Sequence, residues 1–455
     1  MKPKKEWITK ALKRQRKRKD HGIVDFMMIL SHFFRDFTEW ISEMQDPRHQ
    51  SYITYTQTDL TYMGILKNIC GIKSMRSMDE QFNEENCIDT LRILSGDEHL
   101  KEMPHADTLN YYLEMLNPKE LSELRNKMIR RLIRMKSFDR KKLLGKYWRV
   151  ILDGTGLFCF KEKHCENCLK TTVTDKDGKE TTMYYHKVLE AKLVLGDKIV
   201  ISLGTEFIEN ENETISKQDC ETRAAKRLLK RIKETYPRLP ICIQGDALYE
   251  TAPMMEICRE NGWKYLLVHK DGSQKVLEET CEYIRKADGE TLVKGIGKEK
   301  GCGGYINHVE ETAGKREISN IFRYTYDRKE KEDFKTITFN WNTNIELNEK
   351  NLEEMIEAGR GRWKIENEGF NNQKNGIYDI EHLNSYDTNA MKNHYLLTQI
   401  ADIIMQLYLA WNPLRKEIKQ SIKNTSSRLL ESFRGLTVTD EDVLTTSRYT
   451  TIYLE

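Results

Sequence analysis

The sequence has 455 residues, and its 74 Lys and Arg nearly balance its 71 Asp and Glu, which leaves a formal net charge of +3. A chain of this length is too long for one ordinary hydrophobic core, so we expect two or three domains. The longest apolar stretch, residues 394–411, is interrupted by polar side chains, and nothing in the sequence reaches the roughly 18–20 apolar residues of a membrane-spanning helix, so no membrane partner is expected.

Basic residues are concentrated in two runs near the start of the chain. Residues 1–19 hold ten Lys and Arg against one Glu, and residues 125–146 form the second run. Such blocks suit a polyanion, most often nucleic acid, although a disordered basic tail and a solvated helix face would give the same pattern. No apolar segment follows the first run, and the ten scattered cysteines are not a disulfide framework. These features predict a protein of the reducing cytoplasm, without a signal peptide.

Helical periodicity dominates residues 1–146. Apolar residues recur at spacings of three and four over 27–44 and over 120–135, and Pro104 and Asp107 stand where a helix would start. A helical domain with basic faces is suited to binding DNA. We therefore interpret residues 1–146 as a helical, basic, DNA-binding region.

Strand patterns begin at Tyr147 and alternate with helical ones up to residue 270. Asp177-Gly178 and Gly196-Asp197 are typical of the turns that join antiparallel strands. The expected strands are residues 147–158, 184–196, 198–208, 240–249 and 263–270, and the expected helices are residues 219–236 and 250–262. This order predicts a mixed sheet with helices on its faces, and we take residues 147–270 as the first part of that core.

The pattern changes again at residue 271. Residues 271–347 contain three strand-like stretches with no long helix between them, which we interpret as a β insertion. Helical patterns return over residues 348–412, which we assign to the C-terminal helices of the core, and residues 413–455 form a C-terminal tail. The expected fold is therefore α/β: a mixed sheet flanked by helices, with a β-strand insertion and an N-terminal helical domain.

Two aspartates stand at the exits of predicted strands. Asp153 follows the first strand in "ILDGTG", and Asp246 follows the fourth strand in "CIQGDALY". Functional groups gather at strand ends in such sheets, although an aspartate there more often forms a turn or caps a helix. A third carboxylate would complete a site for two Mg²⁺ or Mn²⁺ ions, which can clamp the attacking and leaving oxygens of a phosphodiester.

The third carboxylate is expected on the helix "GRGRWKIENEGFN". At 100° per residue, Arg362, Glu366 and Phe370 share one stripe, whereas Glu368 points roughly opposite. Arg362 is placed to orient Glu366 or to bind a phosphate bidentately. The alternative is a surface Arg–Glu pair that contributes little to stability.

Three blocks in order, "VILDGTG", "QGDALYETAPMMEICRENGWKYLL" and "GRGRWKIENEGFN", resemble the bacterial insertion-sequence transposases of the DDE superfamily. Within this superfamily, the chain resembles the branch that carries a β insertion and a Tyr-Arg-Glu-Lys signature. The resemblance covers roughly residues 147–410. It implies a ribonuclease H-like core in which Asp153, Asp246 and Glu366 bind two Mg²⁺ ions. The implied reaction cuts the element's ends and joins the 3′-hydroxyl to target DNA.

Partners and rival functions follow from the same resemblance. We expect the chain to bind double-stranded DNA, at the element ends and at the target, to form a homodimer on that DNA and to lie with the bacterial nucleoid. One alternative is a nuclease of the same fold that hydrolyses DNA without joining it. Another is a catalytically inactive DNA-binding derivative.

The signature itself departs from the family at two positions. Its Arg and Glu fall on Arg362 and Glu366, but Gly359 occupies the Tyr position and Gln373 the Lys position, with Lys374 one residue late. We expect Arg362 and Lys374 to contact DNA phosphates. Trp341 in the insertion could stack on an extruded base, although a core or edge-strand tryptophan is the commoner role.

A Cys-x2-Cys pair, Cys165 and Cys168, is half of a zinc site. Counting back from an Asp177-Gly178 turn places His186 opposite Leu169, next to Cys168, so His186 with His164 or Cys159 could complete the site. The alternative is a pair of reduced cysteines in a hairpin. Asp219 and Glu221, at the start of the helix over 219–236, are interpreted as capping residues.

Overall fold

The computed structural model describes residues 22–162, 165–211, 217–270, 275–286, 301–311, 317–330, 333–411 and 420–448. The first basic run and His164 lie outside these residues. The chain forms two compact units, Met1–Ser137 with Phe370–Glu455 and Phe138–Gly369.

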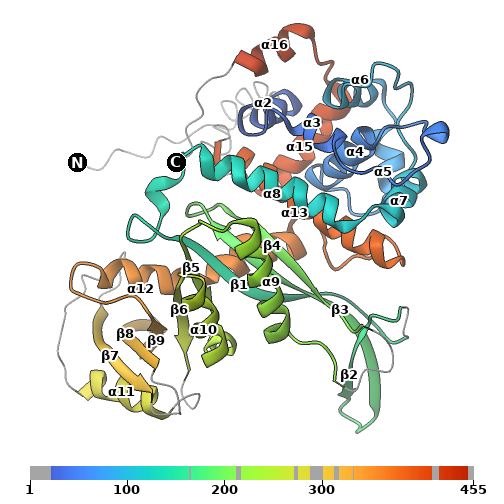
Figure 1. Ribbon diagram of the computed structural model, residues 1–455. Helices are drawn as coiled ribbons and strands as arrows, with labels where there is room; N and C mark the ends of the chain where they lie inside the picture. Colours follow the sequence, from blue (N-terminus) through green and yellow to red (C-terminus); the bar gives the residue numbers. More distant parts are fainter. Residues whose placement is uncertain are drawn as a thin grey trace. The chain divides into compact units, whose positions relative to one another are not determined.

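The first unit is helical and combines the two ends of the chain, the blue to cyan and the orange to red parts of Figure 1. Its described helices are α2 (Ile23–Phe33), α3 (Phe37–Ser42), α4 (Gln57–Ile69), α5 (Met75–Phe82), α6 (Glu85–Ser95), α7 (Ala106–Met115), α8 (Pro118–Arg134), α13 (Thr388–Trp411), α15 (Ile422–Gly435) and α16 (Asp440–Arg448). The 3₁₀-helical turn η1 (Gln50–Tyr52) and the π-helical η6 (Asn372–Gly376) also belong to it.

The core of this unit is α13, the longest apolar stretch of the sequence. It packs against α2, α4, α7 and α8, and its residues from Tyr395 to Leu409 are buried. We expected α13 to complete the α/β core, but its contacts place it with the N-terminal helices. Every described helix is too short or too polar to cross a bilayer.

The second unit is built on one mixed, mostly antiparallel sheet of nine strands. Along the sheet, the order is β2-β3-β1-β5-β6-β9-β8-β7, and β4 pairs with β3. The strands are β1 (Trp148–Phe160), β2 (Leu169–Thr174), β3 (Glu180–Val194), β4 (Val200–Ile208), β5 (Ile241–Gly245), β6 (Lys264–His269), β7 (Gly301–Glu311), β8 (Glu317–Glu330) and β9 (Asp333–Thr343). β1, β3 and β4 pair antiparallel, whereas β5 and β6 run parallel to β1.

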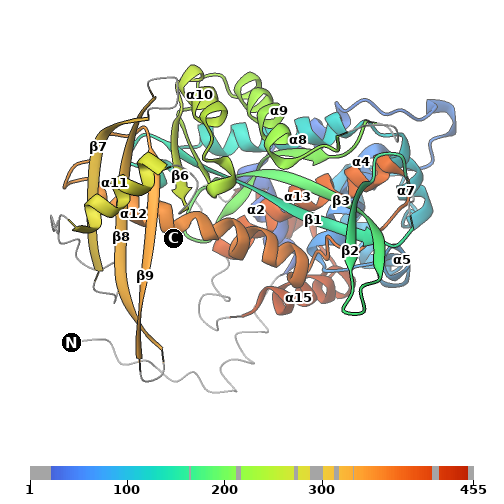
Figure 2. The same cartoon turned by 90° about the horizontal axis from the view of Figure 1, so that it is seen from below.

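Helices cover both faces of this sheet. On one face, α9 (Glu221–Thr235) packs on β3 and β4, and α10 (Ala252–Glu260) packs on β6 (Figure 2). On β9, Asn342 contacts Met255 of α10, whereas Trp341 packs under Gly359 of α12 (Leu352–Arg360). Because neighbouring residues of a strand point to opposite faces, α12 lies across the sheet from α10.

The expected β insertion continues this sheet. β9 pairs antiparallel with β6, from Leu266 opposite Thr343 to His269 opposite Asn340. A helix that the sequence pattern did not reveal, α11 (Lys275–Lys286), precedes the three strands and packs on β7 and β8. The insertion is therefore part of the core sheet rather than a separate β domain.

Candidate carboxylate site

Asp153 lies within β1, partly buried, with 22% of its side chain exposed. Its Oδ1 accepts a hydrogen bond from the backbone N–H of Gly154 at 2.9 Å. Burial raises the pKa of Asp153 to about 6; the positive charge of Arg362 opposes the rise, and the negative charges of Glu221 and Asp246 add to it. Neighbouring acids therefore disfavour the ionised form of Asp153.

Asp246 follows β5, the strand that pairs in parallel with β1. Its Oδ1 accepts from the backbone N–H of Leu248 at 2.9 Å, so it caps the short turn η3 (Ala247–Tyr249). The turn-forming role expected as the alternative is thus present, and the same carboxylate also acts on Asp153.

A buried pair fixes the loop that carries Asp246. Glu250 follows η3, and its Oε2 lies 2.9 Å from Nδ1 of His269 on β6, with both side chains fully buried. The turn is thereby attached to the neighbouring strand. This is the kind of support that holds a functional side chain in a constant position.

Glu221 is a third acid of this cluster, and sequence reasoning assigned it another role. We expected it to cap α9, but Cys220 is the capping residue and no side chain caps the helix. Glu221 instead binds Nζ of Lys187 at 2.5 Å, and its Oε1 accepts from the hydroxyl of Tyr249 at 2.5 Å. The absence of a side chain at Gly154 leaves room for the Glu221 carboxylate, which a Cβ there would strike.

All three acids act on the pKa of Tyr249. Its pKa is raised by burial first, then by Glu221, and further by Asp153 and Asp246. Lys187 is the nearest counter-charge of Glu221 and comes from β3. Three carboxylates from β1, α9 and the exit of β5 therefore share one electrostatic environment.

A long helical segment carries Arg362 and Glu366. After α12 come η4 (Gly361–Trp363) and the π-helical η5 (Ile365–Phe370). Nη1 of Arg362 lies 4.0 Å from Oδ2 of Asp153, which brings the segment to the carboxylates. Glu366, one turn later, is exposed and is not among the main charges that shift the pKa of Asp153.

The π-helical turns alter which side chains of this segment are buried. We expected Glu368 to point away from the sheet, but it is partly buried near Lys364, Lys198 and Asp197, beside the β3–β4 turn. Burial raises its pKa. A π-helix has wider turns than the 3.6-residue spacing on which that expectation rested, and such turns are frequent at functional sites.

The departure of the signature at residue 359 has a packing explanation. A Cβ at Gly359 would lie 2.6 Å from the indole of Trp341, so a tyrosine cannot occupy the position. Trp341 is 1% exposed and stacks on Phe322 and Phe339. Its indole has no free face for a base, so the core alternative describes Trp341.

An exposed tryptophan lies nearby on the same helical segment. Trp363 is 52% exposed, and the guanidinium of Arg362 lies 4.9 Å from its ring centre. Trp363 also lines an open cavity of about 640 Å³ with basic and aromatic side chains. These are Arg328, Arg360, Lys364, Tyr326 and Phe339, and the acids Glu357 and Glu368 also line the cavity.

The departure at residue 373 is explained within the helical unit. Gln373 is fully buried, and its Nε2 donates to Oε1 of Gln399 and to Oδ2 of Asp402, both at 3.0 Å. The expected phosphate contact, Lys374, pairs with Glu381 at 2.8 Å and is 27% exposed. Gln373 thus has a structural role. A lysine at this position has no side-chain acceptor, so the hydrogen bond that Gln399 donates to Gln373 would be lost.

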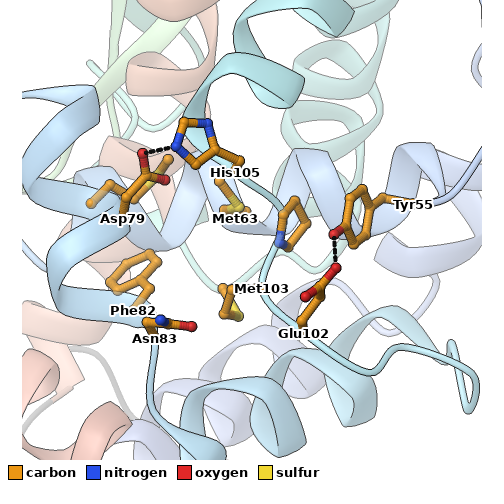
Figure 3. A pocket seen from close by; sticks show the side chains of 10 residues that line it. Tyr55, Met63, Asp79, Phe82, Asn83, Glu102, Met103 and His105 are labelled. Carbon is orange, nitrogen blue, oxygen red and sulfur yellow. Dashed lines mark hydrogen bonds and ion pairs between the residues drawn. The ribbon is translucent and has the colours of Figure 1, made fainter.

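Two further hollows belong to the helical unit. Figure 3 shows a pocket of about 230 Å³ in which Tyr55 bonds Glu102 and His105 faces Asp79, over the side chains of Met63 and Met103. The other hollow, of about 370 Å³, lies along α8 and is lined by Asp36, Trp40, Glu43, Lys127, Arg130, Arg131 and Arg134. The second basic run of the sequence therefore lines a concave surface.

Cys165, Cys168 and His186 come together where the start of β2 lies beside the middle of β3, with their ligand atoms within 4.8 Å of one another. The remaining expected ligand, His164, lies outside the described residues. Cys159 on β1 is exposed, in register with Tyr185.

No protein-family model and no curated protein matches this chain. Among solved structures it is similar to the piggyBac transposase synaptic complex with hairpin DNA, determined by cryo-electron microscopy. The similarity covers 93% of this chain and 84% of that chain, with 11% sequence identity and a TM-score of 0.42.

Proposed function

We propose that this chain is a DNA transposase that cuts at the ends of a mobile element and joins the freed 3′-hydroxyl to target DNA. Asp153, Asp246 and Glu366 are its proposed catalytic carboxylates. The observation that carries the proposal is the pair of aspartates on adjacent parallel strands, because Asp246 raises the pKa of the partly buried Asp153. Acids held together in this way cost free energy unless a cation or a proton neutralises them, which is typical of functional sites.

The sheet supports a ribonuclease H-like core. Three antiparallel strands in the order β4-β3-β1 continue into β5 and β6, which run parallel to β1. The aspartates come from the two adjacent parallel strands near the middle of that order. This is the mixed sheet, flanked by helices, that the order of strand and helix patterns led us to expect, and it is compatible with the core that we propose.

The donor set fits a hard divalent cation such as Mg²⁺ or Mn²⁺, because carboxylate oxygens are its preferred ligands and Asp153 lies among like charges. When bound, a pair of such ions supplies charge neutralisation at the oxygens of a phosphodiester. Asp153 and Asp246 would hold the ions together with Glu366. Glu221 is the rival for the third position, although Lys187 and Tyr249 already occupy its carboxylate.

Both units carry proposed DNA contacts. Arg362, beside Asp153, has the planar guanidinium that binds phosphate bidentately, and Lys374 is a further candidate. Trp363 replaces Trp341 as the aromatic side chain available to a base. In the helical unit, the basic hollow along α8 would bind the DNA backbone. We further propose that the chain acts as a homodimer on DNA.

The first experiment follows cleavage of DNA that carries the element's end. Imperfect inverted repeats flanking the gene would supply that substrate. Wild-type protein should nick it in Mg²⁺, and Asp246→Asn should reduce cleavage on the order of 10³-fold while binding the same DNA. Lys374→Ala is a matched control outside the acids, expected to weaken binding and its salt dependence only. Unchanged cleavage by Asp246→Asn would refute the proposal.

A second experiment separates the transposase from its rivals. Pre-cut ends with free 3′-hydroxyls are incubated with target DNA, and joined products are counted. A nuclease of the same fold would cut intact ends but join none. An inactive DNA-binding derivative would retain both substrates unchanged.

A further inference from the structure

A second cluster of ligand side chains lies away from the carboxylates, where β2 and β3 form a hairpin. Sγ of Cys165 lies 3.3 Å from Sγ of Cys168 and 3.3 Å from Nε2 of His186. The distance from Sγ of Cys168 to the same nitrogen is 3.5 Å. Three soft ligand atoms therefore face one another at nearly equal distances.

The register of the hairpin differs by one residue from our expectation and brings His186 closer. Asp175 closes a longer turn, in which its backbone N–H donates to Lys179 and Gly178 has a φ of +78°. Thr174 consequently pairs with Glu180, and Leu169 with Tyr185 rather than with His186. One step further along the same register, His186 comes opposite Cys168.

The segment that carries the cysteines is held in place by its neighbours. Nδ2 of the buried Asn210, which follows β4, donates to the carbonyl of Cys168 at 2.9 Å. In return, Nδ2 of Asn167 donates to the carbonyl of Asn210 at 2.8 Å. Cys168 and His186 are 4% and 8% exposed, so two of the three ligands are already desolvated.

We propose that Cys165, Cys168 and His186 bind one structural Zn²⁺ ion. Zinc bonds of about 2.3 Å to sulfur and about 2.0 Å to nitrogen in a tetrahedron place two sulfurs about 3.8 Å apart and a sulfur about 3.6 Å from the nitrogen. The present distances reach these values if the side chains move by at most about half an ångström. The fourth position is left to a water molecule or another residue.

The zinc ion would stabilise a hairpin that has little core of its own. Five of the six residues of β2 are exposed, so few apolar contacts hold this strand against β3. A metal bridge from the Cys165–Cys168 turn to His186 on β3 would close the hairpin at its base. This role is independent of the proposed reaction at Asp153.

The test measures metal in the purified full-length chain. We expect about one zinc ion per chain, and less than about a tenth of that in the Cys165→Ser/Cys168→Ser variant and in His186→Asn. Cys302→Ser, which removes an exposed cysteine of β7, is the matched control and should keep its zinc. Circular dichroism shows whether each variant is folded.

Cobalt substitution of the wild-type chain makes the result independent of any variant. Bound Co²⁺ should give the thiolate charge-transfer band that sulfur ligands alone produce, which separates this site from a metal on the carboxylates. Hydrogen exchange over the β2–β3 hairpin should then accelerate at least about tenfold after chelation, without global unfolding. No zinc with no cobalt–thiolate band, or a mass two daltons lower that reports a Cys165–Cys168 disulfide, would overturn the proposal.

Discussion

Asp153 and Asp402 are two aspartates in largely buried surroundings that differ in what faces them. In the helical unit, Asp402 is 3% exposed, and its Oδ2 accepts from the side-chain amides of Gln373 and Gln406 at 3.0 and 2.8 Å. Burial, and then the nearby Asp402, raise the pKa of Tyr378. In the α/β unit, Asp153 instead faces two acids and one arginine.

The difference separates a structural acid from a functional one. Two side-chain amide hydrogen bonds compensate the burial of Asp402, so Asp402 stabilises the fold. The ionised form of Asp153 is disfavoured by burial and by like charge, which the fold tolerates at a cost. Polar groups that lower stability without compensation in the protein are those for which a ligand is the missing partner.

The largest expected effect concerns which acid completes the site at Asp153. Glu366→Gln should lower DNA cleavage on the order of 10³-fold, because it removes a proposed ligand. Glu221→Gln should lower it less than about tenfold, because Lys187 and Tyr249 already hold that carboxylate. Single-turnover cleavage at pH 8 in Mg²⁺ measures both. The reverse ranking would assign the third position to Glu221.

The next prediction compares how the substitution of asparagine for aspartate changes the free energy of unfolding at Asp153 and at Asp402. The raised pKa of Asp153 means that the folded state binds its proton more tightly than the unfolded state, so stability falls as pH rises from about 4 to about 6. Without metal at pH 8, Asp153→Asn should therefore be more stable than wild type by up to about 3 kcal/mol. Asp402→Asn should be less stable by about 2 kcal/mol.

Chemical denaturation at pH 8 and pH 4 tests this pair. The gain from Asp153→Asn should shrink to well under about 1 kcal/mol near pH 4, where folded Asp153 is protonated and unfolded Asp153 is about half protonated. Added Mg²⁺ should stabilise the wild type at pH 8 and not this variant. A destabilised Asp153→Asn at pH 8 would show that Asp153 is compensated like Asp402.

A third test carries the comparison from charge to packing. Gly359 lies against the rigid, buried indole of Trp341, whereas the surroundings of Gly369 leave room for a methyl group, with Ile365 at 3.7 Å. Gly359→Ala should cost about 2 kcal/mol by overpacking, and Gly369→Ala should cost nothing or stabilise slightly. Thermal melting of the two variants measures the difference. Equal melting temperatures would mean that α12 shifts freely over β9.

The smallest expected effect is a displaced pH profile. Because Glu221 contributes to the raised pKa of Asp153, Glu221→Gln should lower that pKa, and the acid limb of DNA cleavage should move down by up to about one pH unit. Lys187→Gln should move it the other way, since it leaves the charge of Glu221 unpaired. Unchanged acid limbs in both variants would show that the charge of Glu221 does not act on the pKa of Asp153.

Local pattern was sufficient to predict much of the α/β unit. Alternating apolar residues revealed β1, β3 and β4, and the short apolar runs before Asp246 and His269 revealed β5 and β6. Asp153 and Asp246 were found because each follows a strand-like run beside a glycine. The position of His186 opposite Cys168 was predicted to within one residue, because a hairpin relates its strands through a short turn.

Long-range contacts were beyond local pattern. Glu221 looked like a helix cap because its partners Lys187 and Tyr249 lie 34 and 28 residues away. Only the structure shows that the Glu221 carboxylate fills the space beside Gly154. The π-helical turns of η5 have no signature in residue spacing, so the burial of Glu368 was not predicted. Whether Glu366 is a ligand stays a prediction.

The pairing of β9 with β6 has a consequence for shortened versions of this protein. Removing residues 275–343 would make β6 an exposed edge strand. The backbone N–H and C=O groups of β6 that now pair with Asn340 to Thr343 would then face solvent. Exposed edge strands pair with strands of other molecules. The shortened protein would therefore aggregate unless a replacement strand with charged residues or proline covered the edge of β6.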